Sequence, residues 1–133
     1  AKALGIAEMV LFCGNVNRPE DYLQAMDVFV MTSLFEGLPI VGVEAQASGL
    51  PCIFADTITQ EVKILPQTQF LALTQPDEAW AERIVQTKPM ERSLAGHCVE
   101  SAGFAEENLD RQVCALYGME EHHFANISGR DHL

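Results

Sequence analysis

Short apolar runs alternate with helical patterns along the first two thirds of the chain, and this alternation limits the possible folds more than any other feature. Four runs have the length and the β-branched or aromatic content of strands, at residues 9–13, 28–31, 51–55 and 69–73. Helical patterns occur at residues 19–26, 39–46, 77–87, 92–102 and 105–117. Strands that are joined through helices pair in parallel. The sequence therefore predicts an α/β fold with a parallel sheet and flanking helices.

The composition is that of one acidic globular domain. The 133 residues are 48% apolar, and 8 Lys and Arg stand against 19 Asp and Glu, which gives a net charge of -11. Such a surface repels phosphate backbones and anionic headgroups, so the sequence argues against nucleic-acid binding and against electrostatic docking on a membrane. No apolar run reaches the roughly 18–20 residues that a membrane-spanning helix needs.

The ends of the chain and its cysteines indicate where the protein is located and how far its domain extends. The chain begins without Met and without a signal peptide, so we expect a cytoplasmic protein and a piece of a longer chain. Residues 119–133 are polar and lack periodicity, so we expect a domain over residues 1–118 followed by a disordered tail. Four widely spaced cysteines without a Cys-x-x-Cys pair are predicted to be buried, reduced thiols: Cys13, Cys52, Cys98 and Cys114.

The segment from Asp27 to Pro51 carries the candidate chemistry. Its pattern predicts a strand, a loop over residues 32–37 and a helix that Pro39 opens. Open α/β sheets bind ligands at the carboxyl ends of their strands, where this loop is expected to lie. Gly37 would let a ligand approach the backbone closely. The free N–H groups and the dipole at the start of the helix favour a phosphate or diphosphate.

Two glutamates flank this predicted phosphate site. Glu44 follows Gly37 by seven residues, which is nearly two helical turns and roughly 10 Å along the helix axis. Glu36, outside the helix, and Glu44, within it, can therefore lie at the two ends of one extended ligand. A carboxylate that accepts from two vicinal hydroxyls is suited to a ribose. Two solvated glutamates would also show this spacing by chance, so the spacing alone leaves both interpretations open.

The block as a whole resembles the Glu-x7-Glu motif of retaining glycosyltransferases of the GT-B fold, family 4 in particular. The matching residues are Ser33, Glu36-Gly37-Leu38-Pro39 and Glu44-Ala45-Gln46-Ala47-Ser48-Gly49-Leu50-Pro51. Cys52 and the run from Thr57 to Val62 are most similar to members that act in capsular or exopolysaccharide assembly. The resemblance implies part of a Rossmann-like, donor-binding C-terminal domain, and its motifs are strongest over residues 9–73.

The resemblance also implies roles for individual residues. Glu36, the candidate catalytic residue, would contact hydroxyls of the transferred sugar, and the backbone at Gly37 and Leu38 would meet the sugar and the distal phosphate. Glu44 would hold the ribose. The implied donor-binding set is completed by Ser33, Pro39 and, around the nucleobase, Gly14, Asn15 and Val16. The donor would be a nucleotide-diphosphate sugar, and the family uses no metal or other cofactor.

Family members carry an Arg and a Lys on an earlier loop and helix that neutralise the diphosphate, and Lys2 and Lys63 do not correspond to them. We also expect the first two strands of the nucleotide domain, and the N-terminal domain that mainly binds the glycan or lipid-linked acceptor, to lie outside this chain. We therefore expect a glycosyltransferase as the whole protein and no activity from this chain alone. Any membrane association would come through the whole protein, at the inner face.

Two other functions compete with this interpretation. The missing cations favour a catalytically incomplete nucleotide-binding module. A flavodoxin-like regulatory domain would need an acidic cluster or a flavin loop at its strand ends, and the sequence shows neither. The missing strands also raise a folding question: either the runs at 9–13 and 28–31 pair directly, or the chain is loosely packed with bare sheet edges.

Overall fold

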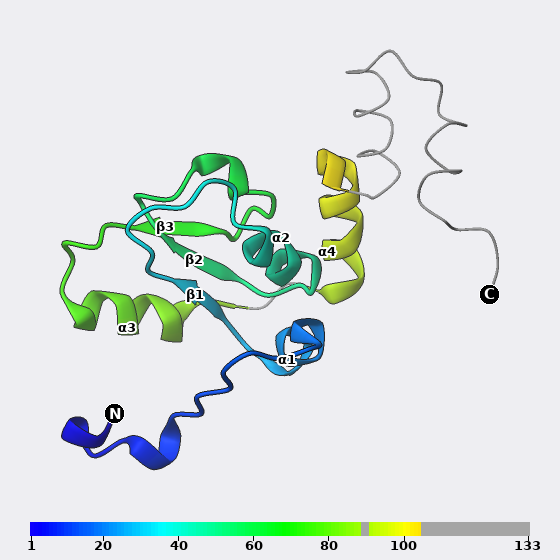
Figure 1. Cartoon of the computed structure of the whole chain (residues 1–133). Helices are drawn as coiled ribbons and strands as arrows, with labels where there is room; N and C mark the ends of the chain where they lie inside the picture. The colour runs from blue at the N-terminus through cyan, green and yellow to red at the C-terminus, as the bar shows by residue number, and fades with distance from the viewer. Residues whose placement is uncertain (89–90, 105–133) are drawn as a thin grey trace.

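The computed structural model describes residues 1–88 and 91–104, and it contains a three-stranded parallel sheet (Figure 1). The strands are β1 (Phe29–Met31), β2 (Cys52–Ala55) and β3 (Gln69–Leu71), in the order β1-β2-β3. In the register, Phe29 lies opposite Cys52, and Ile53 lies opposite Gln69. The predicted α/β fold with a parallel sheet is therefore confirmed.

Helices flank this sheet near the predicted positions. Within the described residues the α-helices are α1 (Pro19–Ala25), α2 (Ile40–Ala47), α3 (Asp77–Gln86) and α4 (Arg92–Val99). Helix α4 packs against α2, whereas α3 lies on the other side of the sheet (Figure 1). The described residues also form three short 3-10 helices, namely η1 (Lys2–Leu4), η2 (Ala7–Met9) and η3 (Gln60–Val62). The predicted helix over 92–102 changes geometry after Val99, where the π-helical turn η4 (Glu100–Phe104) follows.

The core lies between β2 and α2. All four residues of β2 are buried, because this strand is central. The Phe54 ring packs between Phe29 and Phe70, with ring centroids 6.1 Å and 5.8 Å away. Gly42 of α2 lies directly over the same ring, since a Cβ built at Gly42 would be only 2.8 Å from Phe54 Cζ. The missing side chain at Gly42 therefore brings α2 close to the sheet.

A buried glutamine joins α2 to the segment that connects β2 with β3. Gln46 is fully buried, and every polar atom of its side chain is hydrogen-bonded. Its Nε2 donates to the carbonyls of Gly42 (3.0 Å) and Val62 (2.7 Å). Its Oε1 accepts from three donors: the N–H groups of Ile64 (3.0 Å) and Leu65 (2.9 Å) and the hydroxyl of Thr68 (2.8 Å). This set of bonds fixes the connecting segment on the helix.

An arginine holds α4 against the end of α1. Arg92 Nη1 donates to the carbonyl of Gln24 at 2.6 Å and to its side-chain Oε1 at 2.7 Å, and Nη2 donates to the carbonyl of Met26 at 3.3 Å. A cation is favourable at this place because the last carbonyls of a helix carry partial negative charge. Gly49, with φ 76°, ends α2 beside the same arginine, and a Cβ there would lie 2.7 Å from Arg92 Cγ.

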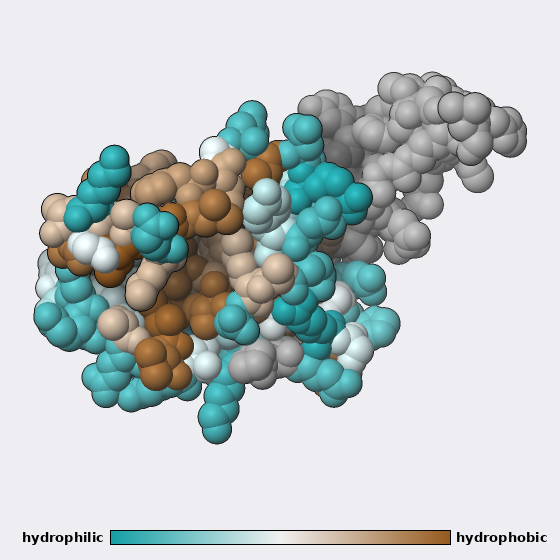
Figure 2. All heavy atoms as spheres, turned by 90° about the horizontal axis from the view of Figure 1, so that it is seen from below, coloured by the Kyte–Doolittle hydropathy of each residue, from teal (hydrophilic) through white to brown (hydrophobic). Residues whose placement is uncertain are grey.

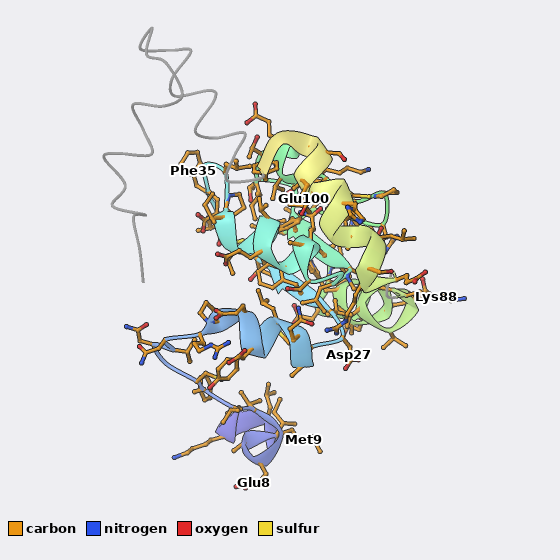
Figure 3. The ribbon with its side chains drawn as sticks, turned by 90° about the vertical axis from the view of Figure 1, so that its right-hand side faces the viewer. Glu8, Met9, Asp27, Phe35, Lys88 and Glu100 are labelled. Atoms are coloured by element: carbon orange, nitrogen blue, oxygen red, sulfur yellow. The ribbon has the colours of Figure 1, made fainter. Side chains whose placement is uncertain are left out.

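The predicted strand over residues 9–13 is wrong. Met9 ends η2, and Met9, Leu11 and Phe12 are 86%, 81% and 83% exposed. Strand geometry needs a hydrogen-bonded neighbour, and in the described part of the chain this stretch pairs neither with β1 nor with another strand. Figure 3 shows the ribbon around Glu8 and Met9 set apart from the sheet, beyond α1. The direct pairing of 9–13 with 28–31 therefore does not occur.

The cysteines only partly follow the prediction of buried thiols. Cys52 is buried in β2, Cys98 is half-buried in α4, and Cys13 is exposed because the stretch around it is not a strand. Cys114, the predicted helix over 105–117 and the predicted tail over 119–133 lie outside the described residues. Among the helices described, none has the length and apolar character needed to cross a bilayer.

Candidate functional site

The loop from residue 32 to Pro39 leaves the carboxyl end of β1 and leads into α2, as the sequence predicts (Figure 1). Pro39 is the N-cap of α2 rather than its first helical residue, since its backbone is extended and its carbonyl accepts from the N–H groups of Gly42 (2.9 Å) and Val43 (3.3 Å). Within residues 1–88 and 91–104, the N–H groups of Ile40 and Val41 have no hydrogen-bond partner. They are therefore available to an anion, and the helix dipole favours one there.

Gly37 stands open to solvent in this loop. A Cβ built there would meet no atom within 4 Å, and Gly37 is not among the glycines with positive φ. Neither the packing nor the backbone conformation of the described chain therefore requires glycine at this position. Leu38, next to it, is 37% exposed, so both residues lie at the surface.

The two glutamates keep their carboxylates outside the core. Glu44 is exposed although its helical neighbours Val43 and Ala45 are buried, and Glu36 is half-buried in the loop. In the part of the chain that the structure describes, neither carboxylate forms a salt bridge. Both groups can therefore accept hydrogen bonds from hydroxyls of a ligand. The loop and the first turns of α2 thus combine two free carboxylates with free amide donors.

A hydrogen bond that the sequence did not reveal supports this loop. The hydroxyl of Thr57, after β2, donates to the carbonyl of Ser33, after β1, at 2.8 Å. The two residues are 24 positions apart, and only the parallel pairing of β1 with β2 brings the ends of their strands together. Thr57 is therefore a candidate positioning residue for the loop, and Ser33 takes part through its backbone.

The residues predicted for the nucleobase pocket are not gathered at this loop. The stretch that contains Gly14, Asn15 and Val16 runs between η2 and α1, on the other side of the molecule from the loop over residues 32–39 (Figure 1). Figure 3 likewise shows Phe35 of the loop and Met9 at opposite ends of the molecule. The structure thus brings together the site residues from Ser33 to Glu44 and leaves Gly14–Val16 apart from them.

The three-stranded parallel sheet with flanking helices is consistent with an α/β domain fragment of a GT-B glycosyltransferase. The chain belongs to the family described as glycosyl transferases group 1, whose family model matches residues 1–87. The chain is 47% identical to a Bacillus subtilis (strain 168) protein that carries the name glycosyltransferase EpsF. The identity extends over 87 residues, which are 65% of this chain and 23% of that protein.

Two further relatives have names that specify a process or an acceptor. The Vi polysaccharide biosynthesis protein VipC/TviE of Salmonella typhi is 36% identical over 117 residues, 82% of this chain and 20% of that protein. The UDP-Gal:alpha-D-GlcNAc-diphosphoundecaprenol alpha-1,3-galactosyltransferase of Escherichia coli is 42% identical over 53 residues, 40% of this chain and 14% of that protein. The chain thus spans less than a quarter of the length of these relatives. No solved structure matches it.

Proposed function

We propose that this chain is the donor-binding part of a retaining glycosyltransferase of family 4, which transfers a hexosyl group from a nucleotide-diphosphate sugar. The observation that carries the proposal is the placement of Glu36 and Glu44, free of salt bridges among the described residues, on either side of the open amides at the start of α2. In this proposal the diphosphate rests on the N–H groups of Gly37, Leu38, Ile40 and Val41, where the helix dipole favours its charge.

The two glutamates would bind the two ends of the donor. Glu44 accepts hydrogen bonds from the vicinal hydroxyls of the ribose, and Glu36 accepts from hydroxyls of the transferred sugar and positions it. Each such bond to a charged group is worth about 1.5–3 kcal/mol. In the retaining reaction that we propose, the departing phosphate helps to deprotonate the acceptor hydroxyl, and no metal is required.

The acceptor is proposed to be a glycan or a lipid-linked glycan of surface polysaccharide synthesis. The names of the relatives support this class, because one is a Vi polysaccharide biosynthesis protein and another acts on a diphosphoundecaprenol-linked sugar. The acceptor would be held mainly by a further domain of the whole protein. The reaction would take place in the cytoplasm, with the whole protein peripheral to the inner face of the membrane.

We also propose that the chain alone is inactive and binds the donor without transferring it. In the described residues, all three arginines have other partners: Arg18 pairs with Glu20 and Asp21, Arg83 with Gln69, and Arg92 with the end of α1. None of them is left to neutralise a departing diphosphate, a contribution that is normally several kcal/mol. The alternative of an incomplete nucleotide-binding module makes the same prediction for this chain, and the two differ only in the activity of the whole protein.

The test is donor binding followed by amide NMR. UDP-galactose, GDP-mannose and ADP-glucose are each titrated into the chain, and we expect one of them to shift the amide signals within residues 37–41, namely those of Gly37, Leu38, Ile40 and Val41. Glu44→Gln should weaken that binding about 10- to 100-fold, since it removes charge-assisted bonds. Glu78→Gln in α3 is the matched control, because it removes an exposed carboxylate away from the loop. Binding that leaves residues 37–41 unshifted, or that is equal in both variants, would contradict the proposal.

A further inference from the structure

Two segments of the chain leave the carboxyl ends of neighbouring strands and run between the same two anchor points. One is the loop over residues 32–39 with the first turn of α2, and the other is the connector, residues 56–68, which joins β2 to β3. Figure 1 shows the two segments leaving β1 and β2 side by side. At the first anchor point, the Thr57 hydroxyl of the connector donates to the Ser33 carbonyl of the loop at 2.8 Å. The connector is therefore attached to the loop where both begin.

The second anchor point is the first turn of α2. Val62, the last residue of η3, is fully buried, and its carbonyl accepts the hydrogen bond of 2.7 Å from Gln46 Nε2. The Val62 side chain also covers Gly42, because a Cβ built at Gly42 would lie 3.2 Å from Val62 Cγ2. Gln46 Nε2 donates to the Gly42 carbonyl as well, at 3.0 Å. The connector is thus held on the same turn of α2 as the N–H groups that are proposed to bind the diphosphate.

Gln46 supplies hydrogen bonds that the rest of the connector needs. Residues 63–68 of the described chain form neither helix nor strand, yet Leu65 and Thr68 are buried. Buried backbone without regular secondary structure needs hydrogen-bond partners from elsewhere. The amide oxygen of the Gln46 side chain accepts from the N–H groups of Ile64 and Leu65. It also accepts from the Thr68 hydroxyl, so one side chain of α2 determines where the second half of the connector lies.

We infer that Gln46 is a positioning residue for the candidate site and that it acts through the connector. Glu44 lies on the exposed side of α2, and Gln46 holds the buried side of the same helix. Since the connector is attached to the loop at one anchor point and to α2 at the other, its displacement lets the loop and the start of α2 move relative to each other. A donor then meets the carboxylates and the amides in the wrong relative position. The choice of ligand rests on the proposed function, whereas the effect of Gln46 on loop motion does not.

The test uses two variants of different severity and one control. Gln46→Met has a side chain of similar length and removes the five hydrogen bonds that Gln46 forms in the described chain, whereas Thr68→Val removes only one of them. Leu23→Ala is the control, because Leu23 is 3% exposed in α1, which lies across the molecule from η3 (Figure 1). Its truncation weakens the core away from the connector. Urea denaturation shows how much stability each variant loses.

Two readouts on the full chain, under conditions in which each variant is folded, separate positioning from stability. Without a ligand, NMR relaxation should show larger motion of the amides within residues 37–41 in Gln46→Met, a smaller increase in Thr68→Val and no change in Leu23→Ala. With UDP-galactose, GDP-mannose or ADP-glucose, whichever binds the unaltered chain, the dissociation constant should rise about tenfold in Gln46→Met and about threefold in Thr68→Val. It should stay the same in Leu23→Ala. Figure 2 shows apolar atoms gathered on the side of the molecule that faces away from η3, so a second protein concentration is used to detect self-association.

A double-mutant cycle then tests the path through the connector. Thr57→Val and Thr68→Val each loosen one anchor point, and the connector is displaced once either is lost, so the combined loss of donor affinity should be smaller than the product of the single losses. Independent losses would overturn the inference. Loop motion that is unchanged in Thr68→Val, or that rises equally in Gln46→Met and Leu23→Ala, would also overturn it. If no donor binds the unaltered chain, the proposed function is wrong, and the loop motion alone decides whether Gln46 positions the loop.

Discussion

The side chain of Gln46 donates a hydrogen bond of 2.7 Å to the carbonyl of Val62, sixteen residues further along the chain. This bond crosses from α2 to η3, and the partners of Oε1 lie in the segment just beyond. A fully buried amide that meets all its partners is stabilising, whereas its loss leaves buried groups unpaired. Gln46 therefore holds together the two segments that follow β1 and β2 in the sequence.

Replacing Gln46 should lower the free energy of unfolding more than replacing an exposed glutamine does. Gln46→Ala leaves the Val62 carbonyl and the Ile64 and Leu65 N–H groups without partners, and we expect a loss of about 3 kcal/mol or more in the free energy of unfolding. Urea denaturation followed by circular dichroism measures it. Gln86→Ala, on the exposed side of α3, is the control and should change the free energy by less than about 0.5 kcal/mol. Equal effects would show that the buried network contributes nothing.

Two glycine-to-alanine substitutions should have opposite effects. In Gly42→Ala the new methyl group would lie 2.8 Å from the Phe54 ring, so α2 must move away from the sheet at a cost of about 1–3 kcal/mol. In Gly96→Ala the methyl group meets nothing within 4 Å, and the better helix propensity of alanine should stabilise α4 by up to about 1 kcal/mol. Thermal unfolding of both variants checks the sign. A Gly42 variant as stable as the unaltered chain would contradict the close packing of α2.

Replacing Thr57 should affect the candidate site by loosening the loop and not by disrupting the fold. Thr57→Val removes the hydrogen bond to the Ser33 carbonyl, and we expect larger backbone motion over residues 33–38 and donor binding weakened about 3- to 10-fold. Thr74→Val, at another exposed threonine whose hydroxyl forms no hydrogen bond with the described residues, is the matched control. NMR relaxation and donor titration on both variants measure the effect. Unchanged loop motion in the Thr57 variant would show that this residue does not position the loop.

The cysteines should differ sharply in their reactivity toward alkylating agents. Burial raises the pKa of the Cys52 thiol to about 12, so almost no thiolate forms there near pH 8, whereas Cys13 is exposed. Iodoacetamide labelling with peptide-resolved mass spectrometry should show rapid modification of Cys13 and slow modification of Cys52. Similar rates in the folded chain would contradict the burial of β2.

The same raised pKa makes stability depend on alkaline pH. In the unfolded chain the Cys52 thiol has the ordinary cysteine pKa of about 9.0, so above that pH it loses a proton that the folded chain keeps until about pH 12. The contribution of this group to stability is therefore complete below pH 9 and falls as the pH rises from there toward 12. Cys52→Ala should lack this component, which urea denaturation across the alkaline range measures.

Much of the fold could be predicted because the strands and helices that form are specified locally. The apolar runs that became β1, β2 and β3 have helices or loops between them that allow parallel pairing, so pattern and topology agree. The run at 9–13 has the same pattern but no pairing partner in the described chain, and composition does not show whether a partner is present. Whether an apolar run is buried in a sheet depends on its neighbouring strands as much as on its own residues.

The candidate site could be predicted only where it is continuous in sequence. Glu36, Gly37 and Glu44 lie within one loop and helix, so the local pattern is sufficient to predict the element that carries each of them, while their role toward a ligand stays a prediction. Thr57 was missed as a positioning residue because its partner is 24 positions away, and Gln46 was missed because a glutamine within a motif gives no sign of burial. Both would have required knowledge of which segments meet in space.

The position of β1 at the edge of the described sheet has a consequence for hydrogen–deuterium exchange. β1 has a neighbour, β2, on one side only, and the loop over residues 32–39 continues directly from its end. Local opening there breaks few bonds, so it requires less free energy than opening around β2, which is paired on both sides. The amides of β1 and its loop should exchange before those of β2, and a ligand that engages this loop would slow their exchange.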